Sequence, residues 1–500
     1  MNIEEPDLKL FEKNYLSGKT QILFHSFSAD IHTPVSILIQ LQKEKYVFLF
    51  ESVEKGSQKG RYSVIGIKPD LIWECKDNKC SITNFETSRK KKFDKKEPLL
   101  SLSSFIKNNK IKLPEQLPSI SSGIFGYMGY EMIKFFENVK LNKKNSLNLP
   151  DSIFIRPSVT LVFDNVNDKI IISQIVTNNK ENKASQAFKK VKKTIYELKK
   201  TICKPIKKKY FVEKEVNKSL DIFKNVKSST TYEEFKVMVN KAKKYINEGE
   251  IFQVVLSRVF KKKINVSPIS IYRSLRYLNP SPYLFFMDFK NFAIVGSSPE
   301  ILIKLDGEDV TIRPIAGTRK RGENKTQDEK LKNELINDPK ELSEHLMLLD
   351  LGRNDISRVS QAGTVKVTDK MYVEFFSHVM HIVSNIVGKL TKNKKSTDVL
   401  FSGFPAGTVT GAPKIRAIEI IDELEKNRRN VYAGSVGYIS VNGNIDTCIA
   451  LRTALIKEKN IYIQAGAGIV ADSNVKNEYK ETENKALALL AATQYAKKFE

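Results

Sequence analysis

The chain has 500 residues, 41% of them hydrophobic, and a formal net charge of +26. This length and composition support a sizeable buried core, in one large domain or two closely packed ones, and exclude an intrinsically disordered protein. The lysines are spread through loops and linkers without a stripe of arginine and aromatic residues, so we expect no nucleic-acid partner.

The sequence begins MNIEEPDLKLFEKNYLSGKT, which is acidic and lacks the apolar core of a signal peptide. No apolar run elsewhere is long enough to cross a membrane. The cysteines form no CxxC pair and are too scattered for a disulfide framework; they are Cys75, Cys80, Cys203 and Cys448. We therefore expect a cytoplasmic protein with reduced thiols and no membrane partner.

The first half has the pattern of short strands with few helices. Apolar or alternating runs are separated by Lys, Asn and Gly; they are QILFHSF, YVFLFES, RYSVIGI, DLIWEC and CSITNF. Residues 122–137, SGIFGYMGYEMIKFFE, are rich in glycine and aromatic residues before they become helical, and 181–200 have helical periodicity with a charged outer face. The lysine-rich segment 203–229 shows little pattern and is interpreted as a linker.

The second half opens with a helix whose start is marked by the capping pair Thr231 and Glu234 and whose end is marked by Gly249. Predicted strands follow: FQVVLSRVF, YLFFMDF, AIVGSS, EILIKLD and DVTIRPI. Asp306 and Gly307 join the last two as a hairpin. Further elements are helices near 341–349, 413–426 and from 475 to the end of the sequence, the strand VMHIVSNIVG, and three strands within 431–464.

These elements show no regular alternation of parallel strands and helices. The predicted fold class is therefore α+β with large antiparallel sheets. We place an amino-terminal domain at residues 1–202, a linker at 203–229 and a second domain at 230–500.

Small and polar residues gather at strand ends in the second half. Gly317 and Thr318 lie in PIAGTRKRG, Arg452 lies in DTCIALRTAL, and residues 466–468 are the GAG of QAGAGIV. Glycines let a backbone N–H approach a ligand closely, and an arginine fork can hold a carboxylate. The same residues could equally serve tight turns and a structural ion pair, so the pattern leaves both open.

Two predicted helices carry glutamates three residues apart, and therefore on one helix face. These pairs are Glu341 with Glu344, and Glu478 with Glu481. Carboxylates from two helices could hold Mg²⁺, which commonly keeps waters and takes an oxygen from its substrate. A solvated helix face would explain the glutamates as well.

Several long motifs of the second half occur in a fixed order: SSPEILIKLDG, TIRPIAGTRKRG, LSEHLMLLDLGRNDISR, FPAGTVTGAPKIRAIEII, VYAGSVGYISVNGNIDTCIALRTAL, QAGAGIVADS and ETENKA. They resemble the chorismate-binding domain of the anthranilate synthase component I family over about residues 225–495. LFES and RYSVIG also resemble the amino-terminal domain of this family. The resemblance implies paired antiparallel sheets with helices outside, an active site in the cleft between them, and the first reaction of tryptophan biosynthesis.

The resemblance also implies roles for individual residues. Glu344 and Glu481 match the Mg²⁺ ligands of the family, and the metal bridges to the ring carboxylate of chorismate. The family's chorismate contacts match Gly317, Thr318, Tyr432, Arg452, Gly466, Ala467 and Gly468. Arg452 is expected to hold the enolpyruvyl carboxylate.

Two positions distinguish the reactions that this family's relatives perform on chorismate. Isochorismate and salicylate formers have a lysine base where Gln253 stands, and an amide cannot act as a base. Aminodeoxychorismate synthases commonly have a nucleophilic lysine where Ala316 stands, and a methyl group cannot form the covalent intermediate. Gln253 with Ala316 therefore implies direct attack by ammonia on the ring carbon next to the carboxylate, giving anthranilate.

Two further residues match the acid–base groups of the family. Glu300 in SSPEIL matches the general acid that assists departure of the ring hydroxyl. His381 in SHVMHIV matches the histidine of the second step, in which pyruvate leaves. His378 competes with it in the same segment, and spacing alone would allow a structural role for either histidine.

The ammonia source and the regulation are also implied by resemblance. No cysteine has the setting of a glutaminase nucleophile, so we expect a separate glutamine amidotransferase subunit as partner, with Cys448 as a packed thiol. The inhibitory tryptophan site of the family resembles Glu51 and Ser52 in FLFES with Pro282, Tyr283 and Leu284 in NPSPYLFF. LFES could instead be only a strand end.

Three alternatives stay open. An aminodeoxychorismate synthase would release a non-aromatic amino product, and Ala316 opposes it. A catalytically inactive homologue should have lost some of the residues that are all present here, namely Glu300, Glu344, His381, Arg452 and Glu481. A basic nucleic-acid binder would show steeply salt-dependent affinity for polynucleotides.

Overall fold

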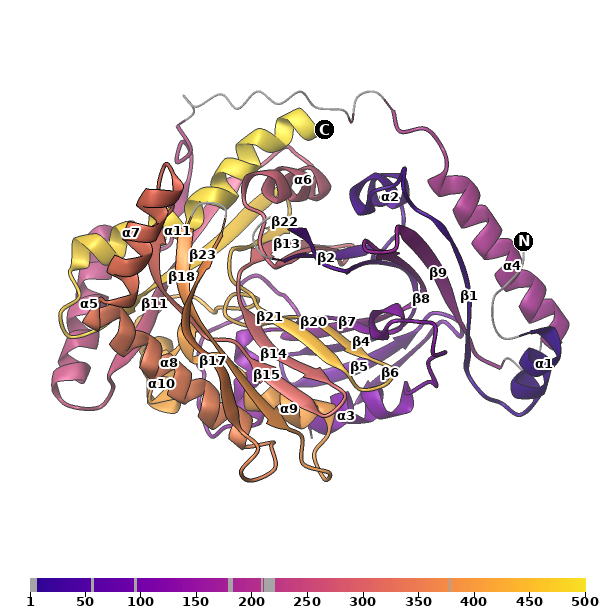
Figure 1. Ribbon diagram of the computed structural model, residues 1–500, viewed down its shortest axis with the longest axis horizontal. Helices are drawn as coiled ribbons and strands as arrows, with labels where there is room; N and C mark the ends of the chain where they lie inside the picture. The colour runs from indigo at the N-terminus through magenta and orange to yellow at the C-terminus, as the bar shows by residue number, and fades with distance from the viewer. Residues whose placement is uncertain are drawn as a thin grey trace.

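The computed structural model describes residues 7–54, 58–93, 97–178, 183–207, 210, 221–376 and 379–500. Within them, the named strands pair antiparallel and form two large sheets that diverge from the long strands β4 (Tyr62–Lys76) and β8 (Ser152–Asp164). Helices cover the outer faces (Figure 1). The predicted α+β class with paired antiparallel sheets is confirmed.

The first sheet runs from an edge in the N-terminal half to an edge in the C-terminal half. Its order is β1 (Gln21–Ser28), β9 (Lys169–Val176), β8, β4, β2 (Phe48–Glu54), β12 (Tyr283–Asp288), β13 (Ala293–Ser298), β22 (Thr453–Lys457), β23 (Asn460–Ile469) and β11 (Gln253–Lys263). Short strands pair at its margins: β3 (Gln58–Lys59), β10 (Lys227–Ser228) and β19 (Gly411–Ala412).

The second sheet uses the other halves of the same two long strands. Its order is β6 (Arg89–Phe93), β5 (Lys79–Asn84), β4, β8, β7 (Gly123–Met128), β20 (Ser435–Ser440), β21 (Ile445–Ile449), β14 (Ile301–Asp306), β15 (Asp309–Ile312) and β18 (Val379–Lys389). β16 (Ile315–Lys320) and β17 (Lys366–Phe375) both pair with β18.

The sheets separate where two prolines meet. Pro69 of β4 lies opposite Pro157 of β8, and the register shifts between Pro69 and Leu71. Proline has no N–H to donate, so the ladder loses hydrogen bonds from both strands at one point. Lys68, immediately before, has φ +52, which adds to the bend. The sequence runs RYSVIGI and DLIWEC are therefore one bent strand rather than the two that we predicted.

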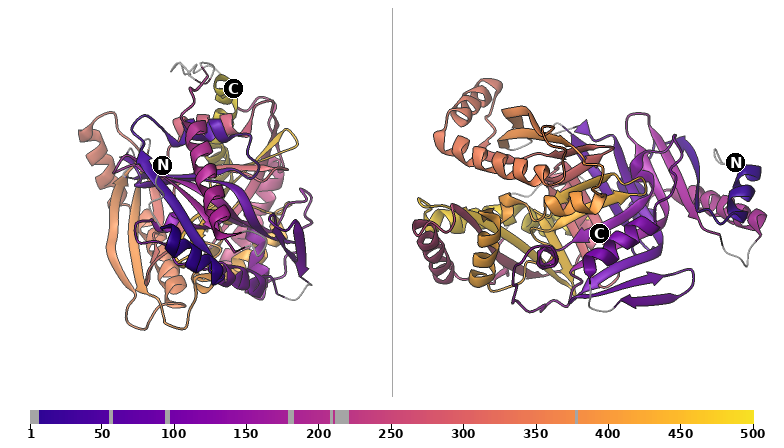
Figure 2. Two further views of the ribbon diagram at one scale, coloured as in Figure 1. Left: turned by 90° about the vertical axis from the view of Figure 1, so that its right-hand side faces the viewer. Right: turned by 90° about the horizontal axis from the view of Figure 1, so that it is seen from below.

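The helices and short 3-10 segments surround this framework. They are α1 (Leu8–Leu16), α2 (Pro34–Leu41), α3 (Pro98–Asn108), η1 (Ser119–Ser121), η2 (Tyr130–Phe135), α4 (Ala184–Ile202), α5 (Tyr232–Asn247), α6 (Pro268–Leu278), α7 (Lys325–Ile336), α8 (Pro339–Ser357), α9 (Ser396–Ser402), η4 (Gly407–Val409), α10 (Lys414–Leu424), α11 (Val475–Tyr495) and η5 (Ala496–Phe499). The right panel of Figure 2 shows the indigo and magenta helices at one end and the orange and yellow helices at the other.

Three apolar clusters hold the layers together. The central cluster takes side chains from both sheets, and the rings of Phe48 and Phe125 stack across it with centroids 4.6 Å apart. A second cluster lies between the first sheet and α1, α2, α4, α6 and α11. A third packs α3 and α9 against the second sheet and α5 and α10 against β11 of the first sheet. Both sheets are thus buried on two faces, which explains their nearly continuous apolar runs.

Local signals in the second half predicted local structure correctly. Thr231 caps α5, its hydroxyl accepting from the Glu234 N–H, while the Thr231 N–H donates to the Glu234 carboxylate at 2.9 Å. Gly249 has φ +78 just after that helix. The β14–β15 hairpin turns at Gly307, where φ is +60.

The two halves of the chain share both sheets. β2 pairs with β12, and β7 pairs with β20, so strands of residues 1–202 are neighbours of strands of residues 230–500. Figure 1 shows purple strands beside yellow ones. The boundary at 203–229 stays a prediction, and residues 208–209 and 211–220 of that linker lie outside the described part. Among the helices of the described ranges, none has the length and hydropathy that a bilayer crossing requires.

Candidate active site

The predicted site residues come together from both sheets and from two helices. The first sheet and its loops provide Gln253, Arg452 and residues 466–468; the second provides Glu300, Gly317, Thr318 and His381; α8 and α11 provide Glu344 and Glu481. Interactions cross between the groups. The Gln253 amide lowers the pKa of the Glu344 carboxyl, and the charge of Arg452 lowers the pKa of His381.

Gly466 and Gly468 leave space that two polar side chains use. A Cβ on Gly468 would lie 2.6 Å from Nε2 of Gln253, and one on Gly466 would lie 2.8 Å from the Tyr432 hydroxyl. Burial raises the pKa of Tyr432 to about 12, and the Gly466 N–H that faces the hydroxyl lowers it in part. Ala467 is fully buried between the two glycines. A larger residue at 466 or 468 would displace Tyr432 or Gln253.

Gly317 lies in a β-bulge, and its carbonyl group points at the ring of His381. It has φ +64 and lies within a register shift between Ala316 and Thr318. Nδ1 of His381 is 2.9 Å from the Gly317 carbonyl oxygen and 3.1 Å from the Thr318 hydroxyl. Because a carbonyl oxygen can only accept, Nδ1 carries a proton, and Nε2 of the neutral ring keeps its lone pair.

Arg452 presents a cation without a carboxylate partner. Burial lowers its pKa, and among the described residues no Asp or Glu forms an ion pair with it. Its φ of +46 is unusual for a residue with a side chain, and the Ser297 N–H holds its carbonyl at 3.1 Å. Burial and this charge together lower the pKa of His381. The structural ion pair that we left open is not found, and the guanidinium is available to an anion.

Glu300 has the electrostatics of a proton donor. It is 7% exposed, just before β14, and its carbonyl accepts from the Ile449 N–H at 3.1 Å. Burial raises its pKa to about 8, with smaller opposing effects from Thr408 and the charge of Lys485. The carboxyl is therefore mostly protonated at neutral pH, as a general acid requires.

Glu344 and Glu481 lie close enough for the charge of Glu481 to raise the pKa of Glu344. Burial raises the pKa of Glu344, and the charges of Glu341 and Glu481 raise it further. Glu341 is tied to Arg319 at 2.9 Å. No group of three or more His, Cys, Asp or Glu in the described ranges is arranged to hold a metal. Two carboxylates completed by water and substrate oxygens nevertheless fit the usual donor set of Mg²⁺.

Sequence reasoning did not identify two residues at the centre of this region. Lys485 donates to the Gly466 carbonyl at 3.0 Å and lies 2.6 Å from the Glu481 carboxylate. Its position four residues after Glu481 is a signal that helical spacing could have revealed. Thr408 affects the pKa of Glu300 although its hydroxyl forms no hydrogen bond of normal geometry. Its neighbourhood with Glu300 arises only in the folded chain.

The two specificity positions are buried and uncharged. Gln253 is 7% exposed at the start of β11, and Ala316 is 8% exposed opposite Ile382. His378 lies outside the described residues, and the choice of His381 rests on its match to the family motif.

The predicted tryptophan residues border a separate cavity of about 420 Å³ between the sheets. Ser52, Tyr283 and Leu284 line it, and Pro282 only adjoins it along the chain. The Tyr283 hydroxyl donates to Asp446 at 2.8 Å, and burial raises the pKa of that carboxyl. Arg61, Lys304 and Tyr438 also line the cavity. Glu51 is held by Arg276 at 2.8 Å.

Comparison with known proteins identifies the family of the chain. A family model described as chorismate binding enzyme matches residues 47–491. The chain is 43% identical over 496 residues to anthranilate synthase component 1 of Cereibacter sphaeroides, covering 97% of both chains. It is 41% identical over 499 residues to that of Aquifex aeolicus, covering 99% of this chain and 98% of the relative. A crystal structure of anthranilate synthase component I from Streptococcus pneumoniae has a TM-score of 0.73 at 35% identity, covering 86% of this chain and 92% of that one. The chain therefore belongs to the chorismate binding enzymes and, among them, to the anthranilate synthase component 1 family.

Proposed function

We propose that this chain converts chorismate and ammonia into anthranilate and pyruvate. The observation that carries the proposal is the grouping of an acid with a pKa of about 8, an unpaired arginine and a neutral histidine around Gln253 and Ala316. A lysine at either of the last two positions would favour another chorismate reaction. Here ammonia itself is the nucleophile.

In the first step, ammonia attacks the ring carbon next to the carboxylate, and the ring hydroxyl departs as water. Glu300 supplies the proton that this leaving group needs. A carboxyl with a pKa of about 8 still carries that proton at neutral pH. Arg452 holds the enolpyruvyl carboxylate during the attack, since no carboxylate of the described residues competes for it. The amine product retains a hydrogen on the carbon that was attacked.

In the second step, that hydrogen is removed as a proton, pyruvate leaves and the ring becomes aromatic. Nδ1 of His381 donates to Gly317, so Nε2 presents the lone pair that accepts the proton. Burial and the charge of Arg452 lower the pKa of His381, which keeps the ring neutral at physiological pH. Both effects favour a base over an acid at this position.

Glu344 and Glu481 would hold Mg²⁺, which would neutralise and orient the ring carboxylate of chorismate. The support is that Glu344 is a buried carboxyl whose pKa is raised by burial and, to a smaller extent, by the nearby charges of Glu341 and Glu481. Lys485 pairs with Glu481 at 2.6 Å and would compete with the metal for that carboxylate. Gln253 interacts with the carboxyl group of Glu344 and thereby links the metal region to β11.

Ammonia would come from a glutamine amidotransferase subunit, because the four cysteines offer no glutaminase centre. Cys75, Cys80 and Cys448 are buried, and Cys203 alone is exposed. Tryptophan would inhibit from the 420 Å³ cavity, with its ammonium group at Asp446 and its carboxylate at Arg61 or Lys304. Ser52 and Leu284 would then contact the remainder of the molecule.

The test is to identify the product formed by the purified chain from chorismate, Mg²⁺ and ammonium at alkaline pH. Chromatography separates anthranilate from aminodeoxychorismate and isochorismate. Anthranilate as the main product supports the proposal. Consumption of chorismate with either of the other products would refute it, and a chain that consumes none would be an inactive homologue.

A further inference from the structure

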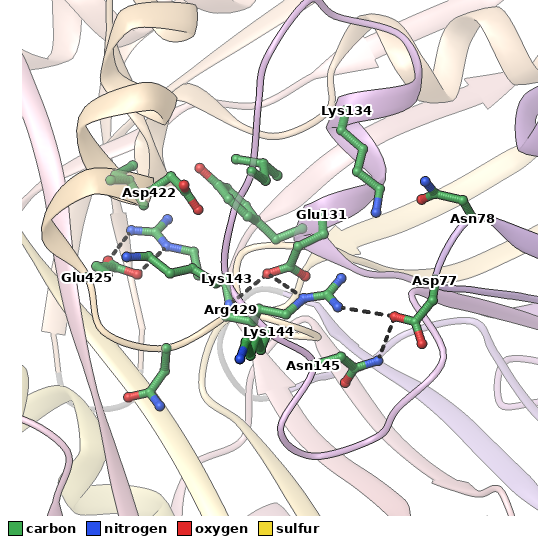
Figure 3. Close-up of a pocket in the computed structure, with 15 residues that line it drawn as sticks. Asp77, Asn78, Glu131, Lys134, Lys143, Lys144, Asn145, Asp422, Glu425 and Arg429 are labelled. Atoms are coloured by element: carbon green, nitrogen blue, oxygen red, sulfur yellow. Dashed lines mark hydrogen bonds and ion pairs between the residues drawn. The ribbon is translucent and has the colours of Figure 1, made fainter.

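Arg429 is a buried arginine that binds three separate segments. It is 3% exposed. Nε donates to Glu425 at 3.0 Å, and Nη2 donates to the other oxygen of that carboxylate at 2.6 Å. Nη1 donates to the Val409 carbonyl at 2.7 Å, and Nη2 also donates to the Val255 carbonyl at 2.7 Å. Figure 3 shows the pair that Arg429 forms with Glu425.

The two carbonyl partners adjoin residues of the candidate active site. Val255 follows Gln253 by two positions on β11. Val409 follows Thr408, whose side chain lowers the pKa of Glu300. Glu425 strengthens the connection to β11, because it also accepts from the N–H of Ser257 at 2.8 Å and from its hydroxyl at 2.7 Å.

The planar guanidinium group of Arg429 also contacts two aromatic rings. Its guanidinium carbon lies 4.8 Å from the ring centroid of Tyr130 and 5.4 Å from that of Tyr432. The Tyr432 hydroxyl is the group that Gly466 faces. Cation–π contact of this kind stabilises a buried ring in one orientation.

We propose that Arg429, held by Glu425, is a positioning residue for the reaction. It fixes the strand of Gln253, the segment of Thr408 and the ring of Tyr432 in one mutual arrangement. It does not touch the substrate. This inference rests on the proposed function of the site, whose residues it orders.

The arrangement requires arginine in particular. A planar fork can serve one carboxylate and two carbonyls at fixed directions while both faces remain free for aromatic rings. A lysine ammonium is a single point donor and cannot reach all of these partners at once. A cavity of about 280 Å³, lined among others by Arg429, Glu425 and Glu131, borders the pair (Figure 3). Packing on that side would therefore not hold a shorter side chain in place.

The test compares Arg429→Lys with Arg156→Lys. Arg156 is also buried and forms a two-pronged ion pair with Asp70, at 2.8 and 2.6 Å, but none of its partners is a site residue. Both variants should lower the unfolding temperature. Only Arg429→Lys should raise both the Kd and the KM for chorismate, by about tenfold or more, because small misplacements of binding groups have large effects. It should also shift the acid-dependent limb of the pH profile of kcat.

Two further variants separate positioning from stability. Glu425→Gln should act in the same direction as Arg429→Lys. In a Tyr432→Phe background, Arg429→Lys should cost less chorismate affinity than in the wild type, since part of its effect passes through Tyr432. Kinetic constants, affinity and pH profile equal to the wild type, with only a lower unfolding temperature, would overturn the inference.

Calorimetric binding of chorismate keeps this test independent of the product. If the wild type forms no anthranilate, the proposed function fails, whereas the affinities still decide the role of Arg429. If Arg429→Lys does not fold, Glu425→Gln with and without Tyr432→Phe provides the same comparison. Equal chorismate affinity in those variants and the wild type would then overturn the inference.

Discussion

Replacing Glu300 with glutamine should strongly slow catalysis and stabilise the fold at high pH. Burial raises the pKa of this carboxyl from its ordinary 4.5 to about 8. The folded chain thus binds the proton more tightly than the unfolded chain does. The resulting stability is fully present below pH 4.5 and is lost as the pH rises through 8. At about 1.4 kcal/mol per unit, the loss is about 4 to 5 kcal/mol.

Glutamine has the same shape without the charge, so Glu300→Gln should escape this loss. Denaturant unfolding should give equal free energies for variant and wild type near pH 4, and a variant more stable by about 3 to 5 kcal/mol at pH 9. Formation of anthranilate should fall by about a hundredfold or more, the typical effect of removing a general acid. Glu115→Gln, at an exposed position, serves as the control. Parallel pH dependence of unfolding in wild type and Glu300→Gln would refute the assignment of a protonated acid.

Three further perturbations test other parts of the site. Glu481→Gln should remove the activation of anthranilate formation by Mg²⁺, and a titration curve equal to the wild type would exclude Glu481 as a ligand. Arg452→Lys should raise the KM for chorismate about 10- to 100-fold, because a charge-assisted fork is lost, and an unchanged KM in steady-state assays would contradict the clamp. Ser52→Phe should place a ring inside the 420 Å³ cavity and abolish inhibition by tryptophan with little change in KM, whereas full inhibition in a dose–response assay would place the inhibitor elsewhere.

Caps and turns could be predicted from a few neighbouring residues, whereas the pairing of strands that are distant in the sequence could not. The capping pair of Thr231 and Glu234 and the turn at Gly307 each depend on a few neighbouring residues, so both could be predicted. The single strand β4 was missed because Pro69 reads as a break, although it bends the strand between two sheets. The predicted division into two domains likewise did not include the pairing of β2 with β12, because these strands lie more than two hundred residues apart in the sequence.

In the candidate site, too, the sequence identified residues but not the contacts between distant segments. The motifs identified the residues, but the pKa shifts of Arg452 and Glu300 depend on burial that only the fold creates. Thr408 had no signal in the sequence, because its partner Glu300 lies more than one hundred residues away. The bulge at Gly317 gives His381 a defined tautomer, which spacing could not reveal.

The most direct test of the central claim is the stoichiometry of the reaction with isotopically labelled ammonium. The purified chain would be incubated with chorismate, Mg²⁺ and nitrogen-15 ammonium, with anthranilate followed by fluorescence and mass spectrometry and pyruvate followed by a coupled lactate dehydrogenase assay. Labelled anthranilate and pyruvate formed in equal amounts would agree with the account. An amino product that keeps its enolpyruvyl group, with no pyruvate released, would contradict it.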